Sequence, residues 1–256
     1  MKTLSIIIVA KDAKDTIEKC LTSASFANEI IVVIDTRSKD QTEEMAKKFT
    51  SKIYKKEWQG YGETKNYAAS KATGDMIFIL DADEVISSKL QDEIKVILKK
   101  EGTADGFFVP EVTYFLDKPI KHCNWYPAYH IRFFKNGKGK YNNKSVHEEL
   151  VLNGKVEKLE NDIMHFSHPD YKTAILKLNE YSSLEVQNKI KSGKIKKIRF
   201  YQFLTKPFFN FGKNYIWHKG FLDGAAGLIL CIHLAIYEFF ILVKTNEYLN
   251  ANKEDK

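Results

Sequence analysis

Apolar residues in the first hundred positions occur in short runs, and amphipathic stretches with the period of a helix separate these runs. Such alternation is typical of βαβ units, in which each helix links two neighbouring parallel strands. We therefore predict an α/β fold with a mostly parallel sheet. The predicted strands are residues 4–9, 30–34, 53–54 and 76–80.

Three local signals predict where helices begin and end. The segments that start at Ser38 and Ser88 both read Ser-x-x-Gln, which matches a helix capping box. Gly74 follows the amphipathic stretch 63–72, at a position typical of a C-terminal helix glycine. We expect helices to begin near Ser38 and Ser88 and another to end before Gly74.

The pattern of apolar and polar residues changes twice after this region. Residues 107–168 contain short aromatic-rich strands and polar turns, and the pattern becomes helical again from residue 171. We expect a domain over residues 1–168, with a nucleotide-binding half at 1–106 and an acceptor-side half at 107–168. A helical region over 169–256 is expected to follow it.

The helical region contains one strongly apolar segment. Residues 224–243 have the length of a membrane span, but His233 and Glu238 interrupt them. The preceding segment 206–221 mixes lysines with aromatic residues, as interfacial membrane segments do. We expect this region to dock on a membrane surface rather than to span it; a buried core helix is the alternative.

Composition narrows the possible partners and compartments. The chain has 40 basic and 33 acidic residues, a net charge of +7 that suits a phosphate-bearing partner or an anionic membrane. The lysines of the N-terminal domain are dispersed, which disfavours nucleic acid. The apolar run at the N-terminus is too short for a signal peptide, and three widely spaced cysteines indicate free thiols in a reducing compartment. We expect a cytoplasmic protein.

Three predicted strands end in an aspartate: Asp12, Asp35 and Asp81. Because the carboxyl ends of parallel strands share one edge of the sheet, these carboxylates should lie along the crevice where ligands bind. They would repel one another unless cationic or hydrogen-bonding groups were present there. The alternative for each is an ordinary turn or cap residue.

Asp81 and Asp83 form an Asp-Ala-Asp motif directly after an apolar strand. If the strand geometry continues, both side chains project to the same side and Ala82 points away. Two carboxylates on one short loop provide the hard oxygen ligands that Mg²⁺ or Mn²⁺ prefers, with positions left for phosphate oxygens. The motif therefore predicts a divalent metal site for a diphosphate.

The chain lacks the glycine motifs of P-loop and dinucleotide-binding proteins. Instead, the segment 58–62, Trp-Gln-Gly-Tyr-Gly, precedes a predicted helix that carries Lys65 and Asn66. It is interpreted either as a loop beneath a nucleotide, with Lys65 near the phosphates, or as a glycine turn with a packed tryptophan.

Over residues 3–245 the chain resembles the family 2 glycosyltransferases of GT-A fold, a Rossmann-like nucleotide-sugar-binding fold. More narrowly, it is similar to the bacterial lipopolysaccharide core glycosyltransferases that add glucose to the inner-core heptose. The segments VHEEL and GFLDG are specific to that subgroup. The matching segments, in order, are LSIIIVAKD, VVIDTRSKDQT, WQGYGETKNYA, GDMIFILDADE, WYPAYHIRFFKNGKGKY, VHEEL and GFLDGAAGL.

The resemblance implies roles for five residues at the donor site. Asp35 would contact the base or ribose of the nucleotide, and Lys65 would lie near the nucleotide. Asp81 and Asp83 would form the diphosphate–metal motif, with Asp83 as the more direct ligand. Arg132, in the motif His-Ile-Arg, is a candidate phosphate partner.

The chain departs from the family pattern at two donor-site positions. Asp12-Ala13 stands where the family usually has Asn-Glu, so a contact from an acid at position 13 is lost. Arg37 stands where a small residue is common, which changes the donor pocket. Asp12 and Arg37 remain candidate donor-binding residues.

Members of this family invert the anomeric carbon in one displacement by an acceptor hydroxyl, which requires a base for the hydroxyl proton. Glu148 is the preferred candidate, with His147 as the alternative base or a metal partner. A solvated loop acid and a packing histidine are the competing interpretations of this pair. His165, His168 and Glu84 are the other candidate bases.

These features together predict an inverting, metal-dependent enzyme, peripheral on the inner face of the cytoplasmic membrane. It would use UDP-glucose with Mg²⁺ or Mn²⁺, and its acceptor would be the lipid-anchored saccharide of the lipopolysaccharide inner core. One alternative is a transferase that loads sugar onto a polyprenyl phosphate. Another is a nucleotide-sugar-binding protein without turnover, which metal-dependent hydrolysis of the nucleotide sugar would distinguish from an enzyme.

Overall fold

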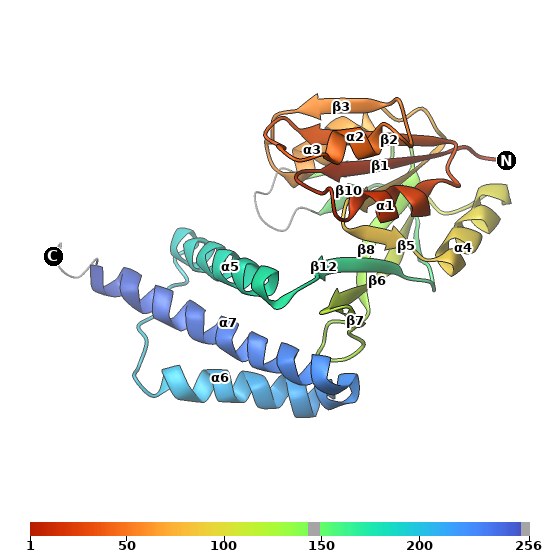
Figure 1. Ribbon diagram of the computed structural model, residues 1–256. Helices are drawn as coiled ribbons and strands as arrows, with labels where there is room; N and C mark the ends of the chain where they lie inside the picture. The colour runs from red at the N-terminus through yellow and green to blue at the C-terminus, as the bar shows by residue number, and fades with distance from the viewer. Residues whose placement is uncertain (143–148, 252–256) are drawn as a thin grey trace. The chain divides into compact units, whose positions relative to one another are not determined.

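The computed structural model describes residues 1–142 and 149–251 (Figure 1). The described chain forms two compact units. The first unit contains Met1–Val112 and Pro127–Phe166, and the second contains Thr113–Tyr126 and the chain from Ser167 onward.

Four parallel strands form the beginning of the sheet in the first unit, in the order β3-β2-β1-β4. All four correspond to predicted apolar runs, so the prediction of an α/β fold with a parallel sheet is confirmed. The strands are β1 (Leu4–Ala10), β2 (Glu29–Asp35), β3 (Ile53–Lys56) and β4 (Met76–Asp81). The helices that link them are α1 (Ile17–Ala24), α2 (Thr42–Ala46) and α3 (Tyr61–Ala69).

Beyond β4 the sheet continues with antiparallel neighbours, in the order β4-β8-β6-β12-β5. Within the described residues, ten strands belong to this sheet, and β9 and β10 form a separate pair. The strands are β5 (Glu84–Ile86), β6 (Gly106–Phe115), β7 (Lys118–Pro119), β8 (Ala128–Lys135), β9 (Gly139–Tyr141), β10 (Leu150–Leu152), β11 (Val156–Lys158) and β12 (Ile163–His168). The helix α4 (Ser88–Lys99) follows β5.

The core of the first unit lies on both faces of the sheet, because successive side chains of a strand point to opposite faces. On β1, Ile6 and Ile8 belong to one buried cluster, and Ile7 and Val9 belong to the other. Every residue of β1 is buried. This two-sided burial explains why the strand reads as a continuous apolar run rather than an alternating one.

The helix α4 begins at Ser88, as predicted, whereas the other two predicted helix boundaries differ from the structure. The helix expected near Ser38 begins at Thr42, whose N–H is accepted by the Asp40 carboxylate at 3.0 Å. The α4 cap is Ser87, one residue earlier than predicted, and its hydroxyl accepts the N–H of Leu90.

Gly74 does not terminate a helix, because α3 already ends at Ala69. A side chain at position 74 would meet the Ser5 hydroxyl at 2.7 Å and the Ser5 backbone N at 2.9 Å. The glycine is therefore needed for close approach to β1, and its N–H donates to the Ser5 hydroxyl at 2.9 Å.

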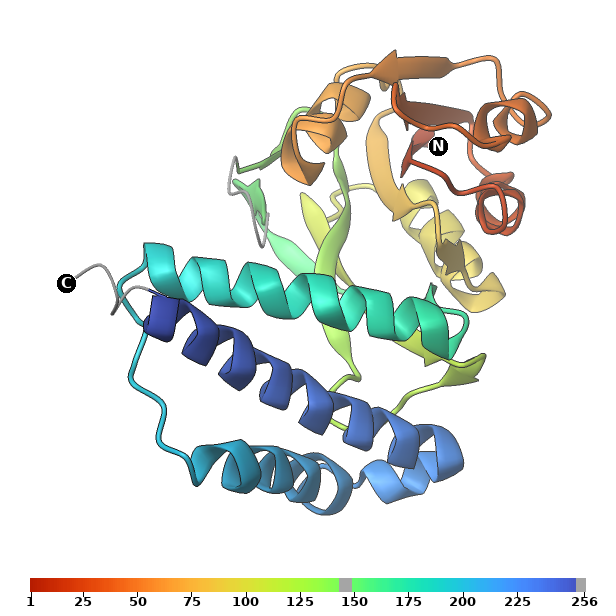
Figure 2. The same ribbon diagram turned by 60° about the vertical axis from the view of Figure 1, so that its left-hand side comes forward.

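The second unit is mainly helical, as predicted, and α7 lies between α5 and α6 within it (Figures 1 and 2). The Lys244 ammonium of α7 donates to the Asn179 carbonyl of α5 at 2.6 Å. On the α6 side, the rings of Phe203 and Phe239 pack edge to face at 6.2 Å. The helices are α5 (Tyr171–Lys191), α6 (Gln202–Gly212), the π-helical turn η1 (Lys213–Trp217), the 3₁₀ turn η2 (Gly220–Asp223) and α7 (Gly224–Ala251).

One helical segment in the described part of the chain, Gly220–Ala251, has the length and composition to cross a membrane. One-third of its most apolar stretch is buried within the structure. Length and apolarity alone also fit a helix that packs inside a protein, so this segment is weak support for membrane association.

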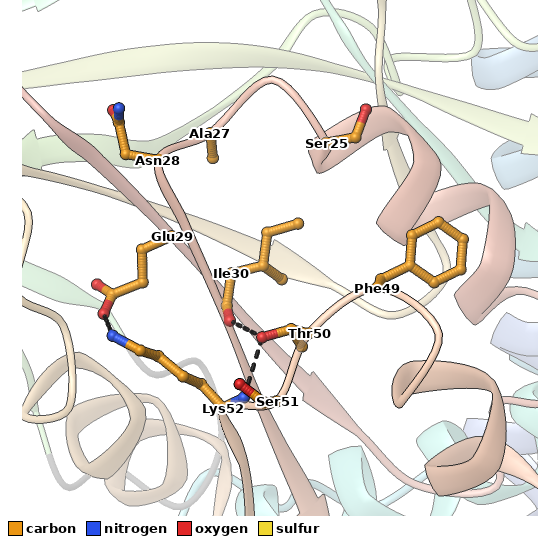
Figure 3. Close-up of a pocket in the computed structure, with 9 residues that line it drawn as sticks. All are labelled: Ser25, Ala27, Asn28, Glu29, Ile30, Phe49, Thr50, Ser51 and Lys52. Atoms are coloured by element: carbon orange, nitrogen blue, oxygen red, sulfur yellow. Dashed lines mark hydrogen bonds and ion pairs between the residues drawn. The ribbon is translucent and has the colours of Figure 1, made fainter.

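A pocket of about 390 Å³ lies at the amino ends of β2 and β3 (Figure 3). Glu29 borders it and pairs with the Lys52 ammonium. Its carboxylate also accepts hydrogen bonds from the Ser5 hydroxyl and from the Thr73 N–H, the latter at 2.9 Å. Although burial opposes the effect, these hydrogen bonds lower the pKa of Glu29 to about 2. The pocket is at the sheet edge opposite Asp35 and is not the predicted donor site.

We predict that Glu29→Gln lowers the free energy of unfolding at pH 7 by about 3 kcal/mol, since 1.36 kcal/mol corresponds to one pKa unit. The folded pKa of Glu29 is below its unfolded value. Its stabilisation is therefore complete above that unfolded pKa and is lost as the pH falls towards 2. Chemical denaturation across this pH range measures the difference between variant and wild type.

Glu43→Gln is the matched control, because Glu43 also pairs with lysines but is much more exposed. It is expected to cost much less than Glu29→Gln, because solvent screens exposed ion pairs. A loss for Glu29→Gln that stays constant down to pH 2 would show that the carboxylate charge is not the cause.

Candidate functional site

The carboxyl ends of β1, β2 and β4 lie side by side, as the sequence predicted. Asp81 pairs in register with Val9 of β1, and Ala10 pairs with Ile34, the neighbour of Asp35. Asp35 and Asp81 therefore flank the end of β1, at two strand spacings or roughly 10 Å across the sheet. The site is built along this edge.

Asp12 braces the loop after β1 against the loop after β2. It adopts a left-handed backbone conformation with φ of 46°. Its carboxylate accepts the Lys39 N–H at 2.8 Å, and its own N–H donates to the Ser38 hydroxyl at 3.0 Å. A further bond runs from the Lys14 N–H to Asp40 at 2.9 Å. Asp12 thus holds together two loops at the predicted donor edge.

Asp35 is buried, and Arg37 makes several hydrogen bonds to its carboxylate. The Arg37 guanidinium donates at 2.8 Å to Oδ2 and at 3.1 Å to Oδ1, and the Arg37 backbone N–H donates at 3.0 Å. These bonds hold the pKa of Asp35 below its usual range. The Arg37 side chain is 54% exposed and the Asp35 side chain is buried, so the guanidinium is the accessible member of this pair.

The glycine loop before α3 contains the packed tryptophan that one interpretation predicted. Gly60 has φ of 107°, and the Trp58 ring lies edge to face with Tyr61 at 4.4 Å. One turn further along α3, the Lys65 ammonium reaches the Asp81 carboxylate at 3.0 Å. The loop therefore places Lys65 beside the Asp-Ala-Asp motif.

Two buried cations, Lys65 and Arg132, hold Asp81. The Arg132 Nη1 lies 3.2 Å from Asp81 Oδ2, and the Lys65 ammonium also lies 5.5 Å from the centre of the Tyr141 ring. Although burial opposes the effect, these two cations keep the pKa of Asp81 below its usual range. Asp81 is therefore ionised and fixed in position.

Arg132 also connects Asp81 to two further buried acids. Its Nη2 lies 2.6 Å from Glu84 Oε1 and 3.6 Å from Glu111 Oε2. Burial raises the pKa of Glu84 to about 7, and the guanidinium opposes that rise. The Arg132 Nε is buried and has no hydrogen-bond partner among the described residues. One guanidinium thus lies among three carboxylates.

Glu111 and His165 extend this network to Asp83. His165 Nδ1 lies 2.7 Å from Glu111 Oε1, and Nε2 lies 3.3 Å from Asp83 Oδ2. Burial disfavours the charged imidazole, but the two carboxylates raise the pKa of His165 to about 11. Burial opposes ionisation of Glu111 as well, and His165 nevertheless lowers its pKa to about 2. Charges of alternating sign therefore run from Lys65 to Asp83.

The strand does not continue through the Asp-Ala-Asp motif, contrary to the assumption in the sequence analysis. β4 ends at Asp81, a turn follows, and β5 begins at Glu84. Ala82 packs into the core, as expected, but the two aspartates contact different groups. Asp81 binds Lys65 and Arg132, whereas Asp83 contacts His165. The N–H of Phe166 donates to the Asp83 carbonyl at 2.9 Å and fixes the turn.

The cluster contains donor atoms of the kind that hold a divalent cation. Among the described residues, ligand atoms of Glu84, Glu111 and His165 lie within 4.8 Å of one another. Arg132 already pairs with both glutamates, so their carboxylate oxygens already bind a guanidinium rather than a metal ion. Asp83 and His165 are the more exposed pair, and a carboxylate with an imidazole fits Mn²⁺.

Glu111 is not among the residues predicted from the sequence, and His165 and Glu84 are predicted only as alternative bases. A charged residue inside the otherwise apolar run of β6 was the available signal, since a buried acid requires a partner. His168 belongs to the second unit and contacts Phe115 and Trp125 rather than this network. The predicted catalytic residues His147 and Glu148 lie outside the described residues.

We predict that Arg132→Gln lowers the free energy of unfolding by about 3–5 kcal/mol, because it leaves buried carboxylates without their cation. Denaturant titration measures this loss. Lys135→Gln is the matched control on the same strand, because Lys135 pairs with Asp105 in a more exposed position. It should cost less than about 1 kcal/mol. Equal losses for the two variants would contradict a central role for Arg132.

Comparisons with known proteins agree with this architecture. Residues 5–151, more than half of the chain, match the family model described as Glycosyl transferase family 2. An uncharacterized glycosyltransferase of Rickettsia typhi is 26% identical over 96% of this chain and 88% of that protein. The lipopolysaccharide core biosynthesis glycosyltransferase LpsC of Rhizobium meliloti is 26% identical over 94% of this chain and 91% of that protein.

A likeness to a solved structure supports the fold. The mannosyltransferase PcManGT of Pyrobaculum calidifontis, solved with GDP-Man and Mn²⁺, aligns with a TM-score of 0.52. The alignment covers 95% of this chain and 87% of that chain, at 13% sequence identity. The shared feature at this identity is the fold.

Proposed function

This chain belongs to glycosyl transferase family 2, and we propose that it transfers glucose from UDP-glucose to a saccharide of the lipopolysaccharide inner core. The observation that carries the proposal is the loop Asp81-Ala82-Asp83, held by buried cations at the carboxyl edge of the parallel strands. The Rhizobium meliloti relative, described as a lipopolysaccharide core enzyme, supports the acceptor class.

The charges around this loop favour a divalent cation together with a diphosphate. The described network carries no net positive charge even when Glu84 is protonated, so it offers a diphosphate alone no net attraction. The cations are Lys65, Arg132 and His165, and the carboxylates are Asp81, Asp83, Glu84 and Glu111. A bound divalent cation would make the net charge of the site positive.

We assign the cation to Asp83 and His165. A bound Mg²⁺ or Mn²⁺ supplies positive charge to the departing diphosphate. Binding through His165 Nε2 requires loss of its proton, and Glu111 would keep the ring oriented through Nδ1. The complex of the archaeal mannosyltransferase with GDP-Man and Mn²⁺ supports a metal in a site of this fold.

The remaining donor contacts in this proposal are those predicted from the sequence. The Asp35–Arg37 pair would contact the uridine, and Lys65 and Arg132 would support the phosphate side through Asp81. An acceptor hydroxyl forms the new bond to the anomeric carbon as the bond to the diphosphate oxygen breaks, with inversion. The hydroxyl proton passes to the carboxylate of Glu148, with His147 as the alternative base.

A lipid-anchored acceptor places the enzyme on the inner face of the cytoplasmic membrane. The lysines and aromatic residues of segment 206–221 support a peripheral membrane location. An enzyme held at that surface would meet its acceptor at a raised effective concentration.

We predict that the purified protein with UDP-glucose and Mn²⁺ glucosylates a truncated inner-core lipopolysaccharide that ends in heptose. Asp83→Ala should abolish transfer while the melting temperature stays near the wild-type value, because it removes a half-buried ligand at the end of the network rather than a core group. Transfer of labelled glucose and thermal unfolding measure the two effects.

Asp92→Ala is the matched control, because Asp92 is an exposed aspartate on α4. It should leave transfer unchanged. Transfer to a polyprenyl phosphate instead would support the alternative acceptor. Absence of both transfer and nucleotide-sugar hydrolysis would indicate a binding protein, and metal-dependent activity in Asp83→Ala would contradict the metal assignment.

We predict that Glu148→Gln lowers kcat roughly a hundredfold or more while donor binding persists, as expected for loss of a general base. Steady-state kinetics and the thermal shift produced by UDP-glucose measure these separately. The neighbouring Glu149→Gln is the matched control and should keep near-normal kcat. Loss of donor affinity with unchanged kcat would place Glu148 in the donor site and leave Glu84 or His165 as the base.

A further inference from the structure

Large apolar side chains on α6, on η1 and on the two residues before α6 are in contact with solvent. Phe200 is 86% exposed, Phe208 is 74% exposed and Trp217 is 80% exposed. Soluble monomers seldom expose contiguous apolar groups of this size without a partner. The exposed side chains that form this α6 apolar face are Phe200, Tyr201, Leu204, Phe208, Phe209, Ile216 and Trp217.

The spacing of these residues places several of them on one side of the helix. Tyr201, Leu204 and Phe208 follow each other at intervals of three and four residues, which align along an α-helix. Phe203 and Phe211, on the same helix, instead face the interior of the unit, where they pack with Phe239 and Tyr215. The α6 apolar face is therefore distinct from the face that packs on α7.

The surrounding segment is strongly cationic. Between Glu185 and Asp223 the chain has nine lysine and arginine residues and no acidic residue. Lys194, Lys196 and Lys197 are exposed in the linker directly before α6, and further exposed lysines lie along α6 and η1. Apolar rings beside a concentration of positive charge match the chemistry of an anionic lipid surface.

The apolar composition of α7 has a separate explanation. Its residues Leu230, Cys231 and Leu242 are buried, and the helix lies between α5 and α6 (Figure 2). The Glu238 carboxylate lies 4.0 Å from the Lys206 ammonium of α6. A position across the bilayer centre would make Glu238 and His233 costly. α7 is thus the supporting helix of this unit.

We propose that the α6 apolar face and the basic segment 189–199 dock on the surface of an anionic phospholipid bilayer. The rings lie at the boundary between headgroups and acyl chains, the lysines contact headgroups, and α7 stays outside the hydrocarbon. This surface extends the membrane location of the proposed function, and it does not depend on the identity of donor or acceptor.

The test is co-flotation of the full-length protein with vesicles of phosphatidylcholine alone or with 30% phosphatidylglycerol. Wild type should partition at least tenfold more strongly onto the anionic vesicles, and added salt should weaken this binding. Phe208→Ser with Phe209→Ser should weaken it at least tenfold. Lys196→Gln with Lys197→Gln lies in an exposed linker, so it preserves the fold, and it should also weaken binding about tenfold.

The matched controls lie on α4 and at its end. Val96→Ser removes an exposed apolar side chain, and Lys99→Gln with Lys100→Gln removes an adjacent exposed pair of lysines. Both controls should bind vesicles like wild type. All variants should keep the thermal shift produced by UDP-glucose and Mn²⁺, so membrane binding and donor binding are scored separately.

Three outcomes would overturn the proposal. Equal partitioning of wild type onto neutral and anionic vesicles would indicate insertion of α7. Self-association in ultracentrifugation without vesicle binding would show that the face contacts a second copy of the chain. Wild-type binding by both α6 and linker variants would place the lipid contact elsewhere.

Discussion

The buried guanidinium of Arg132 is the interaction on which the arrangement of the site depends. It lies among Asp81, Glu84 and Glu111, three carboxylates that come from different parts of the sheet. Without a cation between them, these acids would repel one another in a region from which water is largely excluded. Arg132, on β8, therefore allows the three strands β4, β5 and β6 to bring acidic groups to one place.

This network of buried charges also fixes the position of Asp83. Glu111 is held by Arg132 and in turn orients His165, whose other nitrogen faces the Asp83 carboxylate. Arg132 and Glu111, which lie behind His165, thus fix the exposed end of the network. This is the general way in which proteins orient metal ligands, through partners behind the first layer of contacts.

The second unit shows a different use of apolar residues. α7 is the more apolar helix, and it packs between α5 and α6, which bury about one-third of its most apolar stretch. The more amphipathic α6 exposes its aromatic residues instead. Hydropathy along the chain therefore identifies a segment that is apolar enough to be buried in a protein or a membrane. The helices that pack against this segment decide which of its side chains are buried and which stay exposed.

The sequence by itself determined the parallel strands, the helical C-terminal region and the alignment of Asp35 and Asp81 at one sheet edge, because local periodicity and strand direction encode these features. The tertiary structure decided that Asp81 and Asp83 face different partners. It also decided that Ser5 packs closely against Gly74 and that Glu111 forms a hydrogen bond with His165. Glu111 and His165 lie 54 residues apart on strands β6 and β12. Pairing between buried charges depends on long-range strand order, and no local pattern specifies that order.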